Sequence, residues 1–311
     1  MKWLDCGQIF ETDEYGLVYA KSPQAIVFDN YVRIYFSACK PENNKLISYV
    51  CFADFDKCFQ NILRVSKNIL KDGVLGSFDE HGIFPFSPTK VDDNFYAYTT
   101  GWSRRISVST DTGIGLAISH DNGETFDRFG NGPIITSSLN EPFLVCDGFV
   151  RKYEKFFHMW YIFGIDWIKF KENEPPDRIY KITHAISKDG IEWVKDNAQI
   201  IPDCLEYEAQ ALPSVIKWGD KYHMMFCYRH AYDFRANPSR SYRLGYASSN
   251  DLIDWKRNDN SAFISEQSWA NEMICYPNLF ECNGELYLLY NGNQFGKYGF
   301  GLAKLVNTRR L

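Results

Sequence analysis

The chain has 311 residues, of which 45% are hydrophobic and 23% are charged, and its formal net charge at pH 7 is −5. This composition is typical of a folded globular protein and excludes intrinsic disorder. The mildly negative charge argues against a nucleic-acid partner. The sequence has no run of about 18 apolar residues, so we expect no membrane-spanning helix and no membrane partner.

The nine cysteines are scattered along the chain, and they form neither a CxxC motif nor a Cys/His set with zinc spacing. We therefore expect no transition-metal site and buried free thiols in a reducing compartment. The N-terminal stretch MKWLDCGQIF lacks the apolar core of a signal peptide, so the expected location is cytoplasmic.

An internal repeat of about 60 residues runs along the chain. In chain order, residues 23–36, 85–98, 147–160, 213–226 and 277–290 each predict a strand, a tight polar turn and a second strand. The copies begin at Pro23, Pro85, Asp147, Pro213 and Pro277, with aspartate in place of proline in the third copy.

A third strand follows in each copy and ends near a small residue. These residues are Ala53, Ala117, Ala185, Ala247 and Ala303. In the three middle copies a turn and an aromatic residue come next, in SHDNGETF, SKDGIEW and SNDLIDW, and the aromatic residue begins a fourth strand. The pattern predicts an all-β fold, a five-bladed β-propeller of four-stranded antiparallel blades that forms one domain over residues 1–311. Residues 1–10 are expected to supply the missing outer strand of the last blade.

Acidic residues recur just before the inner strands. Glu80, Glu208 and Glu272 each lie five residues before a proline, while the third copy has Asp147 at its start and Glu141 six residues earlier. In a propeller these positions should meet at one mouth of the central channel. Such a cluster favours acid/base chemistry or cation binding, and Ca²⁺ is compatible with it, although the sequence requires no cofactor. The alternative is that these acids cap strands or pair with arginines.

Polar and aromatic residues in the loops of the same face are candidates for substrate binding. Tryptophan stacks on sugar rings, and arginine and amide groups bind hydroxyls or anions. The alternative is that the arginines pair with the acids and the tryptophans are packed. The candidates are Asp79, His81, Trp102, Arg105, Trp167, Arg229, His230, Arg243, Trp269 and Asn291.

The repeat and the acids before the inner strands resemble those of the five-bladed propeller glycosidases, which include the arabinanase/xylosidase, invertase and β-mannoside phosphorylase families. The stretches GSFDEHGIFP, GIGLAISHDNGETF and WANEMICYPNLF are similar to a bacterial branch of that group. Arabinanases and invertases carry an aspartate beside the proline of the first blade, whereas this chain has Ser22 there. The segment SHDNGETF also matches the Asp-box of sialidases, a structural turn, but five repeats argue against a six-bladed sialidase.

The resemblance implies a glycoside hydrolase that cleaves a glycosidic bond with paired carboxylates. We expect Glu208 or Glu80 as the general acid, Asp147 as the base or as a modulator of pKa, and Glu272 as the opposing carboxylate. One alternative is a glycoside phosphorylase, with phosphate held by Arg229, His230 and Arg243. Two others are a non-catalytic glycan-binding propeller and a protein-interaction scaffold. The expected partner is a small-molecule or oligosaccharide substrate, and the oligomeric state is left open.

Overall fold

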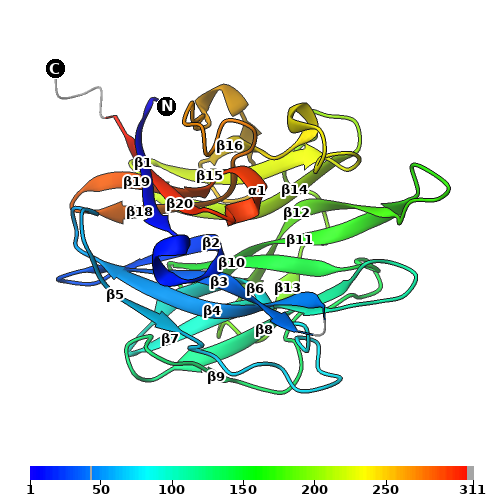
Figure 1. Cartoon of the computed structure of the whole chain (residues 1–311), viewed down its shortest axis with the longest axis horizontal. Coiled ribbons are helices and arrows are strands. Elements are labelled where there is room, and N and C mark those ends of the chain that lie inside the picture. The colour runs from blue at the N-terminus through cyan, green and yellow to red at the C-terminus, as the bar shows by residue number, and fades with distance from the viewer. Residues whose placement is uncertain (43, 307–311) are drawn as a thin grey trace.

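The computed structural model describes residues 1–42 and 44–306, and this part of the chain forms five antiparallel sheets of four strands each. The innermost strands of the sheets contact one another in a closed ring, in the order β2, β6, β10, β14, β18 and back to β2. The predicted all-β, five-bladed propeller is therefore confirmed (Figure 1).

The blades follow the chain order. Blade one contains β2 (Val18–Val27), β3 (Val32–Glu42), β4 (Lys45–Phe55) and β5 (Ile62–Lys67). Blade two contains β6 (Ile83–Val91), β7 (Asn94–Ser103), β8 (Asp111–Ser119) and β9 (Asp127–Arg128). Blade three contains β10 (Val145–Tyr153), β11 (Phe156–Ile168), β12 (Asp177–Ser187) and β13 (Val194–Lys195). Blade four contains β14 (Glu208–Trp218), β15 (Lys221–His230), β16 (Arg243–Ser249) and β17 (Lys256–Arg257).

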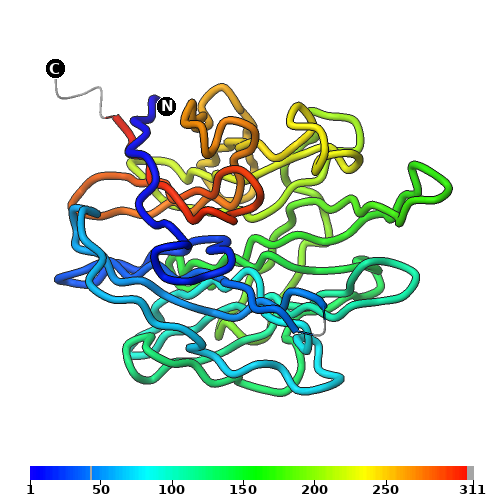
Figure 2. The backbone as a smooth tube through the Cα atoms, in the orientation of Figure 1, coloured from blue at the N-terminus to red at the C-terminus, as the bar shows by residue number. Residues whose placement is uncertain are grey.

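The fifth blade joins the two ends of the described chain. It contains β18 (Cys275–Cys282), β19 (Glu285–Asn291), β20 (Gly299–Leu305) and the N-terminal strand β1 (Trp3–Glu11). Strand β1 pairs antiparallel with β20, so the first strand of the chain closes the ring, and Figure 2 shows the blue and red segments side by side. The helical elements are short turns in loops: η1 (Asp13–Tyr15), η2 (Pro238–Arg240), η3 (Asp259–Ser261) and α1 (Asn293–Gly296). No helix in the described residues is long and apolar enough to span a membrane.

The small residue of each third strand lies at an equivalent place in every blade. Each of these alanines is fully buried and pairs with a buried residue of the second strand, because the close packing of neighbouring sheets leaves no room for a larger side chain. The five pairs are Ala53 with Ile34, Ala117 with Ala97, Ala185 with Met159, Ala247 with Met224 and Ala303 with Leu288. The repeat therefore specifies the core as well as the strand order.

The Asp-box turn of one blade docks on the blade before it. The hydroxyl of Tyr35 in blade one donates a 3.0 Å hydrogen bond to the carbonyl of Gly123 in the turn of blade two. The hydroxyl of Tyr98 in blade two donates an equally long bond to the carbonyl of Gly190 in blade three. These hydrogen bonds tie neighbouring blades together, which is a structural role.

Candidate functional site in the central channel

Each inner strand carries a β-bulge at the point where it lines the channel. Four bulge residues, Ser22, Asp147, Leu212 and Tyr276, have left-handed backbone φ values of 52°, 62°, 48° and 58°. Phe84 occupies the same place in blade two. Strained non-glycine backbone of this kind is common at functional sites and re-aims side chains. Phe84, Asp147, Leu212 and Tyr276 all line the cavity at the floor of the channel.

The bulges correct one detail of the repeat. Asp147 is equivalent to the residue before each proline, and Gly148 takes the place of the proline itself. A Cβ atom on Gly148 would lie 3.3 Å from the Ile114 side chain, which is a tight contact. This shift of one residue in the alignment of the repeats places Asp147 among the bulge residues of the five inner strands.

A cavity of about 420 Å³ opens at the mouth of the channel and receives side chains from all five blades. A smaller cavity of about 50 Å³ continues it, and the two share Phe84, Trp102, Arg178, Tyr180, Tyr242 and Tyr276. Asp147 lines the smaller cavity and therefore lies at the floor of the site.

Asp147 is buried, and its environment favours the protonated form. Its backbone N–H donates to Thr100 Oγ1 at 2.9 Å, and its Oδ2 accepts from the backbone N–H of Leu212 at 3.2 Å. Burial raises the pKa of Asp147 to about 6, against the opposing effects of the Leu212 hydrogen bond and the Arg178 charge. A carboxyl with this pKa can donate a proton near neutral pH.

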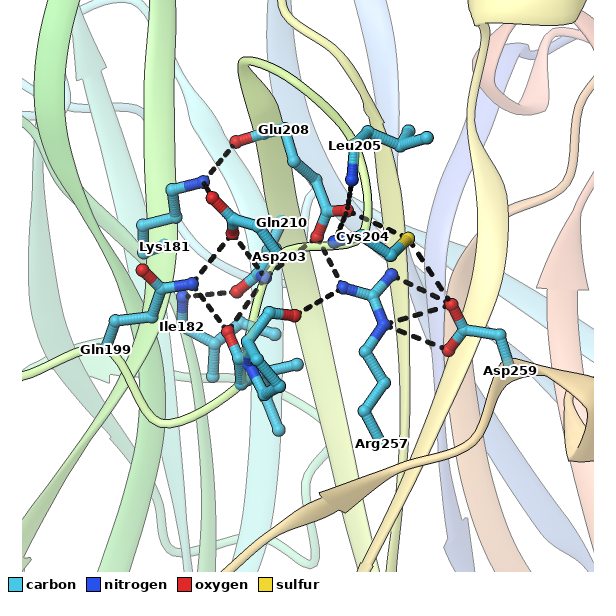
Figure 3. A network of polar contacts seen from close by, with 12 residues as sticks. Lys181, Ile182, Gln199, Asp203, Cys204, Leu205, Glu208, Gln210, Arg257 and Asp259 are labelled. Atoms are coloured by element: carbon cyan, nitrogen blue, oxygen red, sulfur yellow. Dashed lines mark hydrogen bonds and ion pairs between the residues drawn. The ribbon is translucent and has the colours of Figure 1, made fainter.

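Glu208 does not reach the cavity. Glu208 is fully buried in blade four. Its Oε1 accepts hydrogen bonds from Arg257 Nη1 at 2.7 Å and from Gln210 Nε2 at 2.8 Å. Its Oε2 accepts hydrogen bonds from the backbone N–H groups of Cys204 and Leu205, at 3.0 and 3.2 Å (Figure 3). All of its acceptor positions are used inside the protein, so this network supports a structural role.

Two acids before the inner strand of blade two also lie away from the floor of the site. Asp79 is buried and accepts two hydrogen bonds from the guanidinium of Arg128, at 2.6 and 2.8 Å. Glu80 is partly exposed, accepts from the backbone N–H of Gly76 at 2.9 Å and lies 3.4 Å from His81 Nδ1. His81 itself lines the large cavity, so Glu80 is one side chain removed from it.

The blade-five candidates lie outside the central cavity. Glu272 is exposed and lines two other surface cavities, one of them together with Trp269. Trp269 stacks on Tyr290, with a distance of 5.2 Å between ring centroids. Asn291 is buried, accepts from the backbone N–H of Ser22 and donates to the backbone of blade one, so it ties blade five to blade one.

Four further candidates also lie outside the central cavity. Arg105 is exposed and pairs with Asp111 at 2.6 Å. Trp167 is half-buried and packs against the largest core cluster. Arg243 lines the same surface cavity as Glu272. Burial, together with the charges of Arg240 and Arg243, lowers the pKa of His230. The structure thus brings His81, Trp102, Arg229 and Asp147 together and does not bring the four catalytic candidates together.

The sequence interpretation did not single out Arg178, Tyr180 and Lys21, which also line the cavity. Arg178 and Tyr180 lie at the start of β12, on the face where the loop between the second and third strands enters. Lys21 lies just before the first proline. The predicted channel topology places all three on the pocket face, but a search for carboxylates passes over them.

In the described chain, no group of three or more His, Cys, Asp and Glu side chains is arranged to hold a metal ion. The residues that line the large cavity include Lys21, His81, Arg104, Arg178, Arg229 and Arg235, and none of the described lining residues is Asp or Glu. The site is therefore an aromatic, cationic cavity with a single carboxyl at its floor.

No protein-family model matches the chain. Two Mycobacterium tuberculosis proteins, "Uncharacterized protein MT1551" (strain CDC 1551 / Oshkosh) and "Uncharacterized protein Rv1502" (strain ATCC 25618 / H37Rv), are each 30% identical to it over 315 residues. These matches cover 99% of this chain and 100% of either relative.

Among solved structures, one described as "Glycoside hydrolase" has a TM-score of 0.72 at 15% identity and covers 93% of this chain and 88% of its own. A thermostable family-43 glycoside hydrolase has a TM-score of 0.67 at 14% identity, covering 94% and 91%. A family-43 β-xylosidase/α-arabinofuranosidase from a compost metagenome has a TM-score of 0.62 at 14% identity, covering 99% and 96%. The chain therefore belongs to the family of the two mycobacterial proteins, and its fold is that of the five-bladed propeller glycoside hydrolases.

Proposed function

We propose that this protein is a carbohydrate-active enzyme that acts on a glycosidic bond in the central cavity, with Asp147 as the proton donor. The observation that carries the proposal is the position of Asp147, a buried carboxyl with a pKa of about 6 at the floor of a cavity built by five blades. Glycoside cleavage requires an acid that protonates the departing oxygen, and a raised pKa suits that task.

The walls of the cavity support a saccharide as the ligand. Trp102, Phe84, Tyr180, Tyr242 and Tyr276 line it, and aromatic rings bind the apolar faces of sugars while hydroxyl and guanidinium groups bind their polar edges. A volume of about 420 Å³ is within the range of small-molecule sites. The glycoside hydrolase-like fold is consistent with a substrate of this class.

A pair of carboxylates at the cavity finds less support. A retaining or inverting pair needs a second acid roughly 5–9.5 Å from the first. Among the described lining residues of both cavities Asp147 is the one carboxyl, and Glu80 comes next, through its contact with His81. We therefore assign the proton donor to Asp147 and regard Glu80 as the one other acid to test.

The second candidate function is a non-catalytic saccharide-binding propeller. Ser22 favours it, because Ser22 occupies the first-blade bulge, where the glycosidases that the sequence resembles carry an aspartate beside the proline. A cavity with one carboxyl can bind a sugar without cleaving it.

Turnover of a panel of oligosaccharides and aryl glycosides, measured together with saccharide binding by saturation-transfer NMR, tests both candidates. The proposal expects turnover in the wild type, loss of a factor of roughly 10²–10⁴ in Asp147→Asn, and little change in Glu272→Gln. Binding without turnover would support the second candidate. Absence of both binding and turnover across the panel would contradict both.

A further inference from the structure

We propose that the central cavity binds a phosphoryl group, either as inorganic phosphate beside the saccharide or as the phosphate of a phosphorylated sugar. This inference deepens the proposed function and rests on it for the saccharide. It starts from the side chains that line the cavity, because Lys21, Arg104, Arg178, Arg229 and Arg235 come from four of the five blades and meet in one space.

None of these five cations forms an ion pair within residues 1–42 and 44–306. By contrast, buried Arg33, Arg128 and Arg257 elsewhere in the fold each have a carboxylate partner. Like charges that converge without a counterion destabilise a fold, and such an arrangement persists where an anion is bound.

Arg229 is the most buried of the five and is only 1% exposed. Its Nη1 donates to the carbonyls of His230 and Ala231 at 2.8 and 3.1 Å, and its Nη2 donates to the hydroxyl of Tyr180 at 2.9 Å. These are neutral acceptors, and its buried Nε has no hydrogen-bond partner among the described residues. The Phe234 ring, 3.6 Å from the guanidinium carbon, adds a cation–π contact but no negative charge. Arg229 is therefore a buried charge that lacks a counterion.

The neighbouring cations are held in place but keep donors free. Arg178 lies 5.3 Å from the centroid of the Trp102 ring and makes a 3.5 Å contact with Ser109 Oγ. Arg104 uses Nη2 for the carbonyl of Leu46, and Lys21 contacts Ser48 Oγ at 3.1 Å. Desolvation and the charges of Arg229 and Arg178 lower the pKa of Arg235, which indicates that these guanidinium groups repel one another. An anion among them would relieve this repulsion.

Two acids lie near enough to be weighed as the missing counterions. Asp177 interacts electrostatically with Arg229, Arg235 and Arg178, yet it forms no ion pair with them and burial raises its pKa. Burial also raises the pKa of Asp147 to about 6. Even with both carboxyls ionised, two negative charges do not neutralise five cations.

The number and type of cations favour phosphate over a carboxylate. Planar guanidinium groups match phosphate oxygens in bidentate geometry, and a phosphoryl group carries about −1.5 to −2 charges near pH 7. A uronate carboxylate carries a single charge and would leave most of the cluster unpaired. Where inorganic phosphate is the bound species, its oxygen would attack the anomeric carbon, the glycosidic C–O bond would break, and Asp147 would give its proton to the departing oxygen.

The test is titration calorimetry of the whole chain with inorganic phosphate, glucose 1-phosphate, glucuronate and the neutral saccharide that the panel identifies. We expect phosphate or glucose 1-phosphate to bind more tightly than glucuronate. Arg178→Gln and Arg235→Gln should each weaken binding of the phosphorylated probe by roughly 10- to 100-fold, the usual value of a hydrogen bond to a charged group. Arg105→Gln is the matched control, since it removes the same charge from an exposed loop residue outside the cavity, and it should change affinity by less than about twofold.

Arg229→Gln should abolish phosphate binding, and its melting temperature shows whether the fold survives. The two phosphorus probes distinguish the two cases: binding of inorganic phosphate by itself indicates a co-substrate site, whereas binding of glucose 1-phosphate without binding of inorganic phosphate indicates a site for a phosphorylated sugar. Glucuronate binding as tight as phosphate, or equal losses in Arg105→Gln and Arg178→Gln, would overturn the inference. Neutral saccharide binding without phosphate binding would overturn the inference and leave the proposed function in place, whereas loss of both would contradict the two together.

Discussion

The backbone N–H of Leu212 in blade four donates a 3.2 Å hydrogen bond to Oδ2 of Asp147 in blade three. Both residues are bulge residues with left-handed φ, so the hydrogen bond joins two strained positions on neighbouring blades. The bond fixes the direction of the carboxyl at the channel floor. It also stabilises the charged form, which opposes burial and keeps the pKa of Asp147 near 6 rather than higher.

The stability of Asp147→Asn should depend on pH. The pKa of Asp147 is about 6 in the folded chain and 3.8 for an unperturbed aspartate, so between these values the folded chain binds more protons than the unfolded chain. The free energy of unfolding therefore falls as pH rises from about 4 to about 6. Above about pH 6 the full destabilisation caused by burying the ionised Asp147 carboxylate is present. Asn has no charge to bury, so the variant should be more stable than the wild type at pH 7.5 by up to about 3 kcal/mol. Urea unfolding at pH 7.5 and pH 4 measures this, and a variant that is less stable at both pH values contradicts it.

The same pKa predicts the pH profile of turnover. A proton donor is active while it is protonated, so kcat should fall as pH rises through about 6. Removal of Glu80, the acid next to His81, should leave this descending limb in place if Asp147 is the donor. The check is a profile of kcat from pH 4.5 to 8.5 for the wild type and Glu80→Gln. A limb that vanishes in Glu80→Gln would assign the donor to Glu80.

Glu208→Gln should destabilise the fold. The substitution leaves Arg257, whose side chain is only 7% exposed, without one of its two carboxylate partners. Breaking a buried pair costs about 3–5 kcal/mol, although the remaining contact with Asp259 reduces this. The exposed Glu272→Gln is the control and should change stability by less than about 0.5 kcal/mol. Thermal unfolding measures both, and an unchanged melting temperature in Glu208→Gln together with loss of turnover would indicate a catalytic Glu208.

Two tryptophans that the sequence does not distinguish should differ in saccharide binding. Trp102 lines the central cavity and contacts Arg178, whereas Trp167 lies outside both central cavities and packs against the core. Trp102→Ala should weaken binding by roughly 10-fold, since a stacked ring contributes about 0.5–1.5 kcal/mol beyond its buried area. Trp167→Ala should leave the dissociation constant unchanged. Equal losses in the two variants would argue against stacking on Trp102.

Asp121 of the Asp-box should stabilise the fold above the pKa of an unfolded aspartate and less as pH falls below it. Although burial opposes it, hydrogen bonds from Ser119 and Thr125 lower the pKa of Asp121, with distances of 2.7 Å from Ser119 Oγ and 2.6 Å from Thr125 Oγ1. A lowered carboxyl pKa stabilises the fold above the unfolded pKa, and this contribution is lost as pH falls through the folded pKa. Asp121→Ala should therefore lower the melting temperature at pH 7, and this loss should become smaller as pH falls below the unperturbed pKa of 3.8. A loss that stays constant as pH falls would refute this explanation.

The fold is predictable because its signal is repeated. Ala53, Ala117, Ala185, Ala247 and Ala303 mark one packed position in five blades, and each copy supports the others. The sequence repeat aligns Asp147 with the prolines of the other copies, whereas strand pairing aligns Gly148 with them. The offset arises because a glycine does not resemble the prolines that hold the equivalent place. A bulge is a property of strand pairing, which sequence spacing does not resolve.

The site was only partly predictable, because sequence spacing does not show where a side chain points. Glu80 and Glu272 lie in loops before their inner strands, whereas Glu208 is the first residue of β14 and points to Arg257, which is 49 residues away along the chain. Asp147 stands out in the sequence because it interrupts the prolines at the starts of the repeats. Arg178 and Lys21 had no comparable signal, since a cation near a strand end is common on protein surfaces.

The central claim is most directly tested by the crystal structure of Asp147→Asn in complex with the saccharide identified by the panel. The account predicts a sugar ring against Trp102, with the glycosidic oxygen about 2.6–3.2 Å from the side chain at position 147. A saccharide bound instead in the surface cavity lined by Trp269 and Glu272, with the central cavity empty, would contradict it.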